Sequence, residues 1–480
     1  MNYPRIIQGG MGVAVSSWPL ARAVALKGQL GVVSGTALDV VLARRLQLGD
    51  IGGNVRRALD HFPVKDMAER IWSRYFIPGG KAPTAPFKSK PVPDLHPSEA
   101  LNELMVVGNF VEVWLAKHGH NGPIGINMLE KIQLPTLPSL FGAMLAGVDF
   151  VLMGAGIPRA IPACLDSMST LSLTELKIDV AGELPGDDFV FRFDPRKYAP
   201  AGMESLKRPE FLAIVSSAPL AQSLARKSTG KVNGFVIEHH TAGGHNAPPR
   251  GAMTLNEKGE PIYGPRDEAD LAAFRELGLP FWLAGSYGDP EQLRYAVENG
   301  AVGIQVGTAF AYCDESGILP ELKKRVLQAS REGKVGVYTD PLASPTGFPF
   351  KVVQLPGTMS DPEVYKNRNR ICDLGYLRTP YRKEDGTLGY RCASEPIEDF
   401  LKKGGALEDT AGRKCVCNGL LTTVGIGQVR KGSGLEPELV TSGDEVARVA
   451  RFIPEGKDSY SAADVIDYLL AGIAEHAQVG

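Results

Sequence analysis

Short apolar runs alternate with amphipathic stretches along the first two thirds of the chain. The amphipathic stretches, such as SWPLARAVALKG and DPEQLRYAVENG, open with a capping residue and end in Gly, as helices do. Alternation of this kind produces parallel strands with crossover helices, and eight units ending in a Gly-Thr turn favour a closed (β/α)₈ TIM barrel over an open doubly wound sheet. The eight strand-like runs cover residues 5–9, 30–35, 123–129, 149–155, 211–217, 234–240, 280–286 and 302–308.

Two stretches exceed this eightfold pattern. Residues 51–120, mostly helical in pattern, follow the second run, and residues 172–208 follow the fourth. Insertions that follow strands emerge at the C-terminal face of a barrel, so we expect them to serve as a lid or as specificity elements. Beyond residue 330 the periodicity gives way to loops and one final amphipathic helix. We therefore predict a barrel over residues 1–330 with helical insertions, and a C-terminal extension over residues 331–480 packed on it.

Composition and charge exclude some classes of protein but do not indicate a function. The formal charge is -2, from 52 basic and 54 acidic residues, which gives no reason to expect a nucleic-acid partner. The N-terminal segment lacks the pattern of a secretory signal, and no apolar run reaches the length of a membrane span. We expect a cytoplasmic protein that acts on a small molecule, and homo-oligomer formation stays open.

Three histidines and a Gly-Gly pair follow the sixth run. Adjacent glycines let backbone amides approach a planar ligand, and His245, directly after Gly243 and Gly244, is placed to exchange a proton with it. A tight turn with a surface histidine is the alternative. A zinc site from His239, His240 and His245 is another. Because adjacent strand residues point to opposite faces, His239 and His240 are not expected to share one ion.

The seventh and eighth runs each end in small residues. In barrels the loops after the last two strands commonly form a phosphate site, where backbone amides bind phosphate oxygens. Either loop alone is explained by strands ending in glycine, but the two together favour phosphate. Nearby aromatic residues, which either line the site or pack the core, are Trp282, Tyr287 and Tyr312.

Several segments resemble one enzyme family. IIQGGMG at the start, GIN in the third run, AGGH after the sixth, AGS in the seventh, QVGTAF in the eighth and the later TDPLASPTGFPFK are similar to the framework of the nitronate monooxygenase (2-nitropropane dioxygenase) family, which includes FMN-dependent enoyl-acyl-carrier-protein reductases. The resemblance implies FMN as cofactor and His245 as the catalytic residue. The FMN-binding residues that it implies are Gly10, Met11, Asn127, Glu238, Gly243, Gly244, Gly285, Ser286, Gln305, Val306, Gly307 and Thr308.

One departure concerns the residues before AGGH. The family usually carries Gln-Gly-x-Glu there, whereas this chain has Glu238, His239, His240 and Thr241. This difference changes the local charge at the cofactor and leaves the substrate open.

The six cysteines are too few for a disulfide framework. Cys164 and Cys313 are expected in or near the core. In the extension Cys372, Cys392, Cys415 and Cys417 could in principle assemble a four-thiolate metal site, but their spacing is irregular, and buried free thiols are the alternative. We predict no metal ligands.

Three functions are consistent with these patterns. The first is a nitronate monooxygenase-like enzyme that oxidises alkyl nitronates with dioxygen, with His245 as base. The second is an FMN-dependent NAD(P)H enoyl-thioester reductase, in which residues 51–120 receive the acyl group. The third is a non-catalytic barrel that binds a phosphate-bearing ligand.

Overall fold

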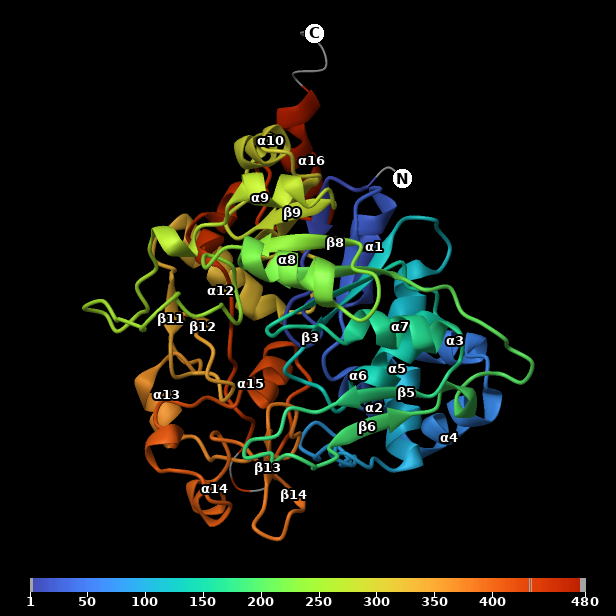
Figure 1. Cartoon of the computed structure of the whole chain (residues 1–480). Helices are drawn as coiled ribbons and strands as arrows, with labels where there is room; N and C mark the ends of the chain where they lie inside the picture. The colour runs from blue at the N-terminus through green and yellow to red at the C-terminus, as the bar shows by residue number, and fades with distance from the viewer. Residues whose placement is uncertain (1–2, 431, 433, 475–480) are drawn as a thin grey trace.

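The computed structural model describes residues 3–430, 432 and 434–474 of the 480-residue chain. Figure 1 shows helices α2 to α5 (blue to cyan) on one side of the central strands and residues from the extension (orange) on the other. Among the described residues no helix is both long and apolar enough to cross a membrane.

Eight parallel strands form the central sheet, in the order β1-β10-β9-β8-β7-β4-β3-β2. The two ends of this order meet through a parallel bridge between Ile7 and Leu30 and a backbone hydrogen bond of 3.0 Å from Gln8 to Leu30. The sheet therefore closes, and the predicted TIM barrel is confirmed, with a strand in each predicted run. The strands are β1 (Ile6–Gln8), β2 (Gly31–Ser34), β3 (Ile124–Leu129), β4 (Phe150–Gly154), β7 (Glu210–Val215), β8 (Gly234–Glu238), β9 (Phe281–Ala284) and β10 (Gly303–Val306).

The strands are apolar along their length because both faces are covered. On β2, Val32 belongs to the cluster that fills the barrel, while the next residue, Val33, packs in the layer shared with the outer helices. This alternation follows the two-residue period of a strand. Trp282 on β9 is fully buried inside the barrel, and its indole N–H donates to the Pro4 carbonyl at 2.9 Å.

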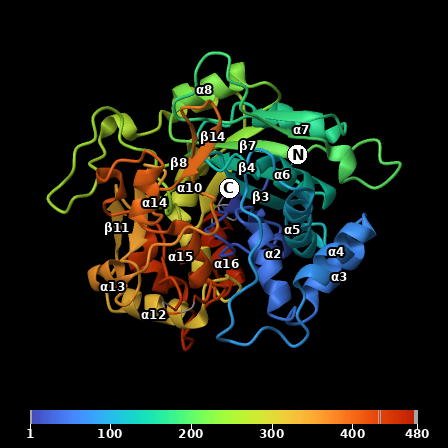
Figure 2. The ribbon, with the colours of Figure 1, turned by 90° about the horizontal axis from the view of Figure 1, so that it is seen from below.

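Helices surround this barrel (Figure 2). The first ring helix, α1, contacts α16 at the far end of the chain, and α16 also packs against α10. The ring is therefore completed by a helix of the extension. The helices are α1 (Trp18–Leu26), α2 (Leu38–Gln47), α3 (Asn54–His61), α4 (Lys65–Tyr75), α5 (Glu99–Lys117), α6 (Thr136–Leu145), α7 (Ile161–Ser169), α8 (Ala218–Lys227), α9 (Leu271–Glu276), α10 (Pro290–Glu298), α11 (Thr308–Ala311), α12 (Pro320–Arg331), α13 (Pro362–Asn367), α14 (Ile397–Lys402), α15 (Val416–Thr423) and α16 (Ala462–Ala474).

The two insertions differ in structure. Residues 51–120 hold α3, α4 and α5, in line with the helical pattern, whereas residues 172–208 contain an antiparallel hairpin of β5 (Thr174–Lys177) and β6 (Val190–Phe193). We had expected both insertions to be helical, and for the second insertion this prediction is wrong. On β5 buried and exposed residues alternate strictly, which is the pattern of a strand with one wet face.

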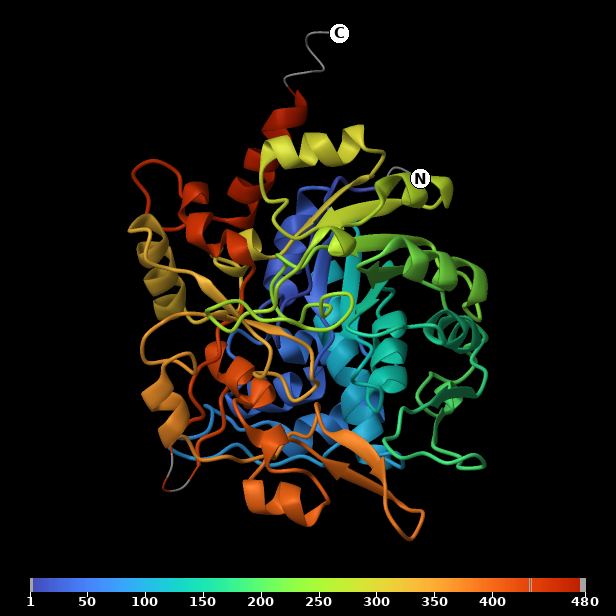
Figure 3. The ribbon, with the colours of Figure 1, turned by 60° about the vertical axis from the view of Figure 1, so that its left-hand side comes forward.

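The extension runs along one side of the barrel, from α16 at one end to the hairpin of residues 379–391 at the opposite end (Figure 3). It contains two antiparallel pairs, β11 (Val337–Asp340) with β12 (Phe350–Val353), and β13 (Thr379–Arg382) with β14 (Leu388–Arg391). β12 is tied to the loop after β8 by the bridge between His245 and Phe350. This pairing brings the extension over the C-terminal face of the barrel.

Candidate functional site

A cavity of about 220 Å³ opens at the C-terminal ends of the barrel strands. Loops after β1, β8, β9 and β10 line it, together with residues of β3 and of the extension. All the predicted site residues line this cavity: Gly10, Met11, Asn127, Glu238, Gly243, Gly244, His245, Gly285, Ser286, Gln305, Val306, Gly307 and Thr308.

The loop after β1 is held by a buried glutamine at the end of the strand. Gln8 donates to the Ser16 hydroxyl at 2.8 Å and accepts from the backbone N–H of Val32 at 3.0 Å. The loop packs tightly against β3, since a Cβ added at Gly10 would lie 2.3 Å from the Cβ of Asn127. Only glycine therefore lets the backbone pass this close to Asn127.

Glu238 ends β8 and faces the cavity. Its carboxylate makes no hydrogen bond or ion pair within the described residues, and desolvation raises its pKa to about 7. The side chain is partly accessible through the cavity although protein surrounds it. A carboxyl group with this pKa exists in both protonation states near neutral pH, so it can donate or accept a hydrogen bond to a ligand.

His245 lies on the same wall, in contact with the extension. Its Nε2 lies 2.7 Å from the Ser344 hydroxyl, and its ring meets Phe350 edge to face at a centroid distance of 4.8 Å. Desolvation lowers the pKa of His245 to about 4, so the imidazole is neutral at neutral pH. A neutral imidazole beside a cavity can accept a proton from a ligand.

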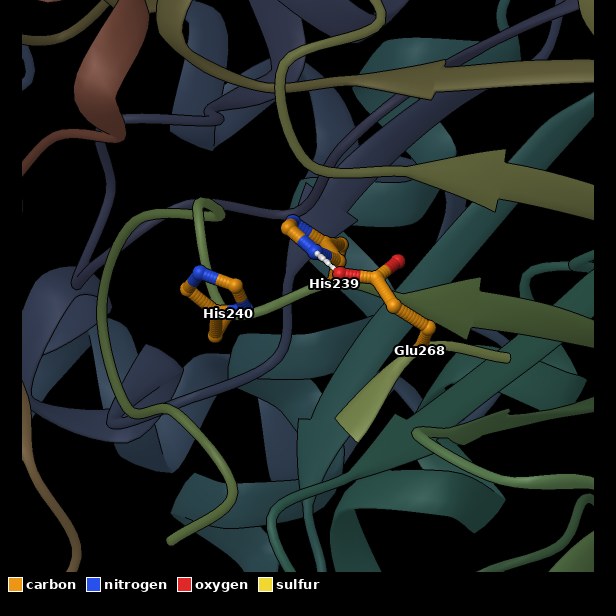
Figure 4. A group of neighbouring side chains, drawn as sticks. All are labelled: His239, His240 and Glu268. Atoms are coloured by element: carbon orange, nitrogen blue, oxygen red, sulfur yellow. Dashed lines mark hydrogen bonds and ion pairs between the residues drawn. The ribbon is translucent and has the colours of Figure 1, made fainter. Parts of the chain in front are cut away.

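The other two histidines of the segment lie near Glu268 (Figure 4). His239 approaches Glu268 at 3.1 Å, and His240 stacks on Tyr263 at a centroid distance of 4.1 Å. The rings of His239 and His240 are only 3.9 Å apart, contrary to our expectation that they would diverge. β8 ends at Glu238, so the two residues lie in a turn, where the strand rule does not hold.

Potential ligand atoms of His239, His240 and Glu268 lie within 4.8 Å of one another, but His245 is not part of this group. The structure therefore does not assemble the three-histidine set considered from the sequence. His239 already uses both ring nitrogens, for Glu268 and for the Thr241 hydroxyl at 2.9 Å.

The loops after β9 and β10 form the remaining wall of the cavity. Gly285 has φ +94, and a Cβ there would lie 2.9 Å from His239, so this turn requires glycine. The Oε1 of Gln305 is buried without a hydrogen-bond partner. Buried polar atoms without partners are rare, so Gln305 is an atom that a ligand in the cavity could satisfy.

The extension supplies a part of the wall that the sequence analysis missed. The N–H of Gly443 donates to the Thr308 hydroxyl at 2.9 Å, and the Thr441 hydroxyl accepts from the N–H of Gly244 at 3.0 Å. The extension thus holds two of the predicted cofactor loops in place. Its lining residues include Phe350, Leu374, Tyr376, Leu377, Val416, Cys417, Leu420, Leu421, Thr441, Ser442, Gly443 and Glu445.

Neither insertion lines the cavity, which corrects the expectation that residues 51–120 and 172–208 supply a lid or specificity elements. Helix α5 instead packs against α2 and α6 in the outer ring. Of the nearby aromatic residues, Tyr287 lines the cavity, whereas Tyr312 and Trp282 are fully buried packing residues.

Comparisons with known proteins give a partial sequence match. No family model matches the chain. Over 128 residues, 27% of this chain and 35% of the relative, it is 31% identical to the probable nitronate monooxygenase of Bacillus subtilis (strain 168). Over 122 residues, 25% of this chain and 31% of the relative, it is 24% identical to (3aS,4S,5R,7aS)-5-hydroxy-7a-methyl-1-oxo-octahydro-1H-indene-4-carboxyl-CoA dehydrogenase of Mycobacterium tuberculosis (strain ATCC 25618 / H37Rv). The chain thus matches about a third of the length of these curated relatives.

Among solved structures, FabK from Thermotoga maritima aligns with a TM-score of 0.49 and 14% identity, over 100% of this chain and 94% of that one. The nitroalkane oxidase of Streptomyces ansochromogenes aligns with a TM-score of 0.46 and 15% identity, over 99% and 97%. The sequence match to the Bacillus subtilis protein confirms the resemblance of this chain to the nitronate monooxygenase (2-nitropropane dioxygenase) family.

Proposed function

We propose that this chain is an FMN-dependent oxidoreductase that oxidises alkyl nitronates with dioxygen and uses His245 as a base towards neutral nitroalkanes. The observation that carries the proposal is the convergence of the site residues that the family resemblance implies. Residues that are far apart in the sequence, from Gly10 to Thr308, line one cavity at the C-terminal ends of the strands, which is where barrel enzymes place their active sites.

The residues of the cavity fit FMN in two respects. Gly10 and Gly243 pack their bare backbone against Asn127 and against residues 442–443, which keeps both loops close around the cavity. The unpartnered Oε1 of Gln305 can accept a hydrogen bond from a flavin ring. The loops at 285–286 and 307–308 would hold the phosphate end, as loops after the last two strands do in other barrels. Bound FMN would supply the redox chemistry, taking electrons from the substrate and passing them to dioxygen.

His245 is suited to moving a proton in this site. Since its pKa is about 4, the ring is unprotonated across the neutral range, so it can act as the proton acceptor. The Ser344 hydroxyl can donate to Nε2 when that nitrogen is bare, or accept from it when it carries a proton. Ser344 therefore holds the ring in one orientation in both protonation states.

A second candidate is an FMN-dependent reductase of thioesters. The Mycobacterium tuberculosis relative acts on a carboxyl-CoA substrate by its name, and one wall of the cavity is apolar through Leu374, Leu377 and Leu420. An acyl group would lie against this wall of the extension rather than against residues 51–120.

Anaerobic spectroscopy of the FMN-loaded protein separates these functions. We expect an alkyl nitronate to bleach the flavin absorbance, and admission of oxygen to restore it. Bleaching by NADPH alone, followed by reoxidation with an enoyl thioester, would overturn the nitronate assignment in favour of the reductase. A protein that binds no FMN would contradict both and favour a phosphate-ligand-binding barrel.

A variant tests the proton transfer. His245→Ala is expected to keep FMN and to oxidise preformed nitronate, while turnover of the neutral nitroalkane falls by about 100-fold or more, which is the usual contribution of a general base. His96→Ala, at an exposed site, is the matched control. Unchanged turnover of the nitroalkane by His245→Ala would exclude the base role.

A further inference from the structure

Two histidines and a glutamate meet outside the large cavity. His239 and His240 lie in the turn after β8, and Glu268 lies in the segment before α9. Potential ligand atoms of the three side chains lie within 4.8 Å of one another, and the Nε2 of His239 is 3.1 Å from the Oε1 of Glu268 (Figure 4). A tetrahedral zinc ion with bonds of about 2.0–2.2 Å holds its nitrogen and oxygen ligands about 3.3–3.5 Å apart. His239 and Glu268 therefore already have nearly the spacing of two ligands on one ion.

Neighbouring groups fix the orientation of both imidazole rings. The Nδ1 of His239 lies 2.9 Å from the Thr241 hydroxyl. With Nδ1 protonated and donating to this hydroxyl, Nε2 carries a lone pair that can bind a metal ion, which is how metal-binding histidines are commonly held. The ring of His240 stacks on Tyr263 at an interplanar angle of 6°, and the Tyr263 hydroxyl donates to the Ala247 carbonyl at 3.0 Å. Both rings are thus held in place without a bound ion.

The two histidines also line a small cavity of about 30 Å³, which has room for an ion or a water molecule. The Nδ1 of His240 is buried and has no hydrogen-bond partner within the described residues. Two carboxyl groups of the same cavity, Glu238 and Asp267, face one guanidinium, that of Arg250, which donates to a backbone carbonyl at 3.1 Å. An unpartnered ring nitrogen among carboxyl groups favours a cation as the ligand.

The cysteines of the extension do not form an alternative site for the same ion. Cys372, Cys392, Cys415 and Cys417 line a separate cavity of about 10 Å³. In the part of the chain that the structure describes, no three of their sulfur atoms lie within 4.8 Å of one another. Cys415 donates to the Ile371 carbonyl at 3.8 Å, as a protonated thiol does. The four residues are free thiols, which is one of the two alternatives considered from the sequence.

We propose that His239, His240 and Glu268 bind one divalent cation of the zinc class. Two histidines and one glutamate are a ligand set that zinc uses in proteins, with water in the remaining position. The sequence analysis predicted no metal ligands, and it expected the two histidine rings to diverge as adjacent residues of a strand do. The strand ends before His239, so the turn brings the two rings to 3.9 Å. The proposal is independent of the oxidoreductase function, because none of the three ligands lines the large cavity.

Zinc binding by the full-length protein, freed of metal by a chelator and of any affinity tag, tests the proposal. Isothermal titration calorimetry near neutral pH is expected to show one Zn²⁺ per chain. X-ray absorption at the zinc edge should show nitrogen and oxygen neighbours at about 2.0–2.2 Å and no sulfur. A sulfur shell at about 2.3 Å would place the ion among the cysteines. That result, or the absence of saturable binding, overturns the proposal.

Variants locate the ion. His240→Ala and Glu268→Gln are each expected to weaken zinc binding by about 100-fold or more, because loss of a group that only orients a ligand already costs about 10–100-fold. The Glu268 side chain is 63% exposed, so Glu268→Gln removes the charge without disturbing the core. His118→Ala and Glu276→Gln, both at exposed positions, are the matched controls and should keep the wild-type affinity. Wild-type zinc affinity in either ligand variant, with an unchanged circular dichroism spectrum, would contradict the ligand set.

Discussion

Replacement of Glu238 by Gln tests the electrostatics of the cavity. The carboxylate has no hydrogen-bond or ion-pair partner in the described part of the chain, and its pKa is about 7 instead of the ordinary 4.5. Gln has nearly the same shape but no charge. In the flavin-free protein Glu238→Gln should therefore remove the cost of ionising this group and change little else.

The sign and the size of the stability change caused by Glu238→Gln follow from the pKa of Glu238. Between pH 4.5 and pH 7 the folded protein holds the Glu238 proton more tightly than the unfolded chain does, so stability falls as the pH rises through this window. Above pH 7 the full cost is present, about 3 kcal/mol at 1.36 kcal/mol per pKa unit. For a 480-residue chain the unfolding entropy is about 1 kcal/mol/K, so the gain in melting temperature is about 3 °C.

Thermal unfolding of the flavin-free protein at pH 8 and at pH 4 checks this expectation. Glu238→Gln should melt about 3 °C above the wild type at pH 8 and at about the same temperature at pH 4. Glu276→Gln, at an exposed position on α9, should show no difference at either pH. If Glu238→Gln melts below the wild type at pH 8, or at the same temperature as the wild type at both pH values, the carboxylate does not carry the expected cost of ionisation.

Three further outcomes are expected. Since the pKa of His245 is about 4, turnover of a neutral nitroalkane by Glu238→Gln, which removes the cavity group that titrates near pH 7, should stay level from pH 8 to pH 6, and a profile of this variant that falls near pH 6.5 would contradict this. Gly10→Ala places a methyl group 2.3 Å from Asn127 and should weaken FMN binding by about 10-fold or more, at an overpacking cost of about 1–3 kcal/mol, in a fluorescence titration. Gly443→Ala, whose Cβ would lie 2.8 Å from a backbone oxygen of the loop after β8, should likewise lower FMN affinity, whereas Gly264→Ala, in open space, should not.

The barrel could be predicted from the sequence because its strands are buried on both faces. Continuous apolar runs such as β2 and β4 stand out against the amphipathic helices between them. The loop residues of the site followed from the same logic, since strand ends of a closed barrel converge on one face. The sequence alone thus places Gly243 and Gln305 at the same face of the barrel.

The contribution of the extension could not be predicted in this way. Thr441 and Gly443 reach the cavity through single hydrogen bonds to loops that lie far away in the sequence, and such contacts leave no periodic pattern. The four extension cysteines were visible, but their spacing has no meaning until the β13–β14 hairpin and α14 are folded. The final helix, α16, was predicted as an amphipathic helix of the packed extension, but its contacts with α1 and α10 in the ring could not be predicted.

A titration of the flavin-free protein with FMN and, separately, with riboflavin tests most directly whether the cavity is a flavin-phosphate site. Our proposal predicts one FMN per chain, bound by the loops at 285–286 and 307–308, which line the cavity. Riboflavin should bind at least about 10-fold more weakly, because a charge-assisted phosphate contact contributes about 1.5–3 kcal/mol. Equal affinity for the two would contradict the phosphate site, and no binding of either would contradict the flavin assignment itself.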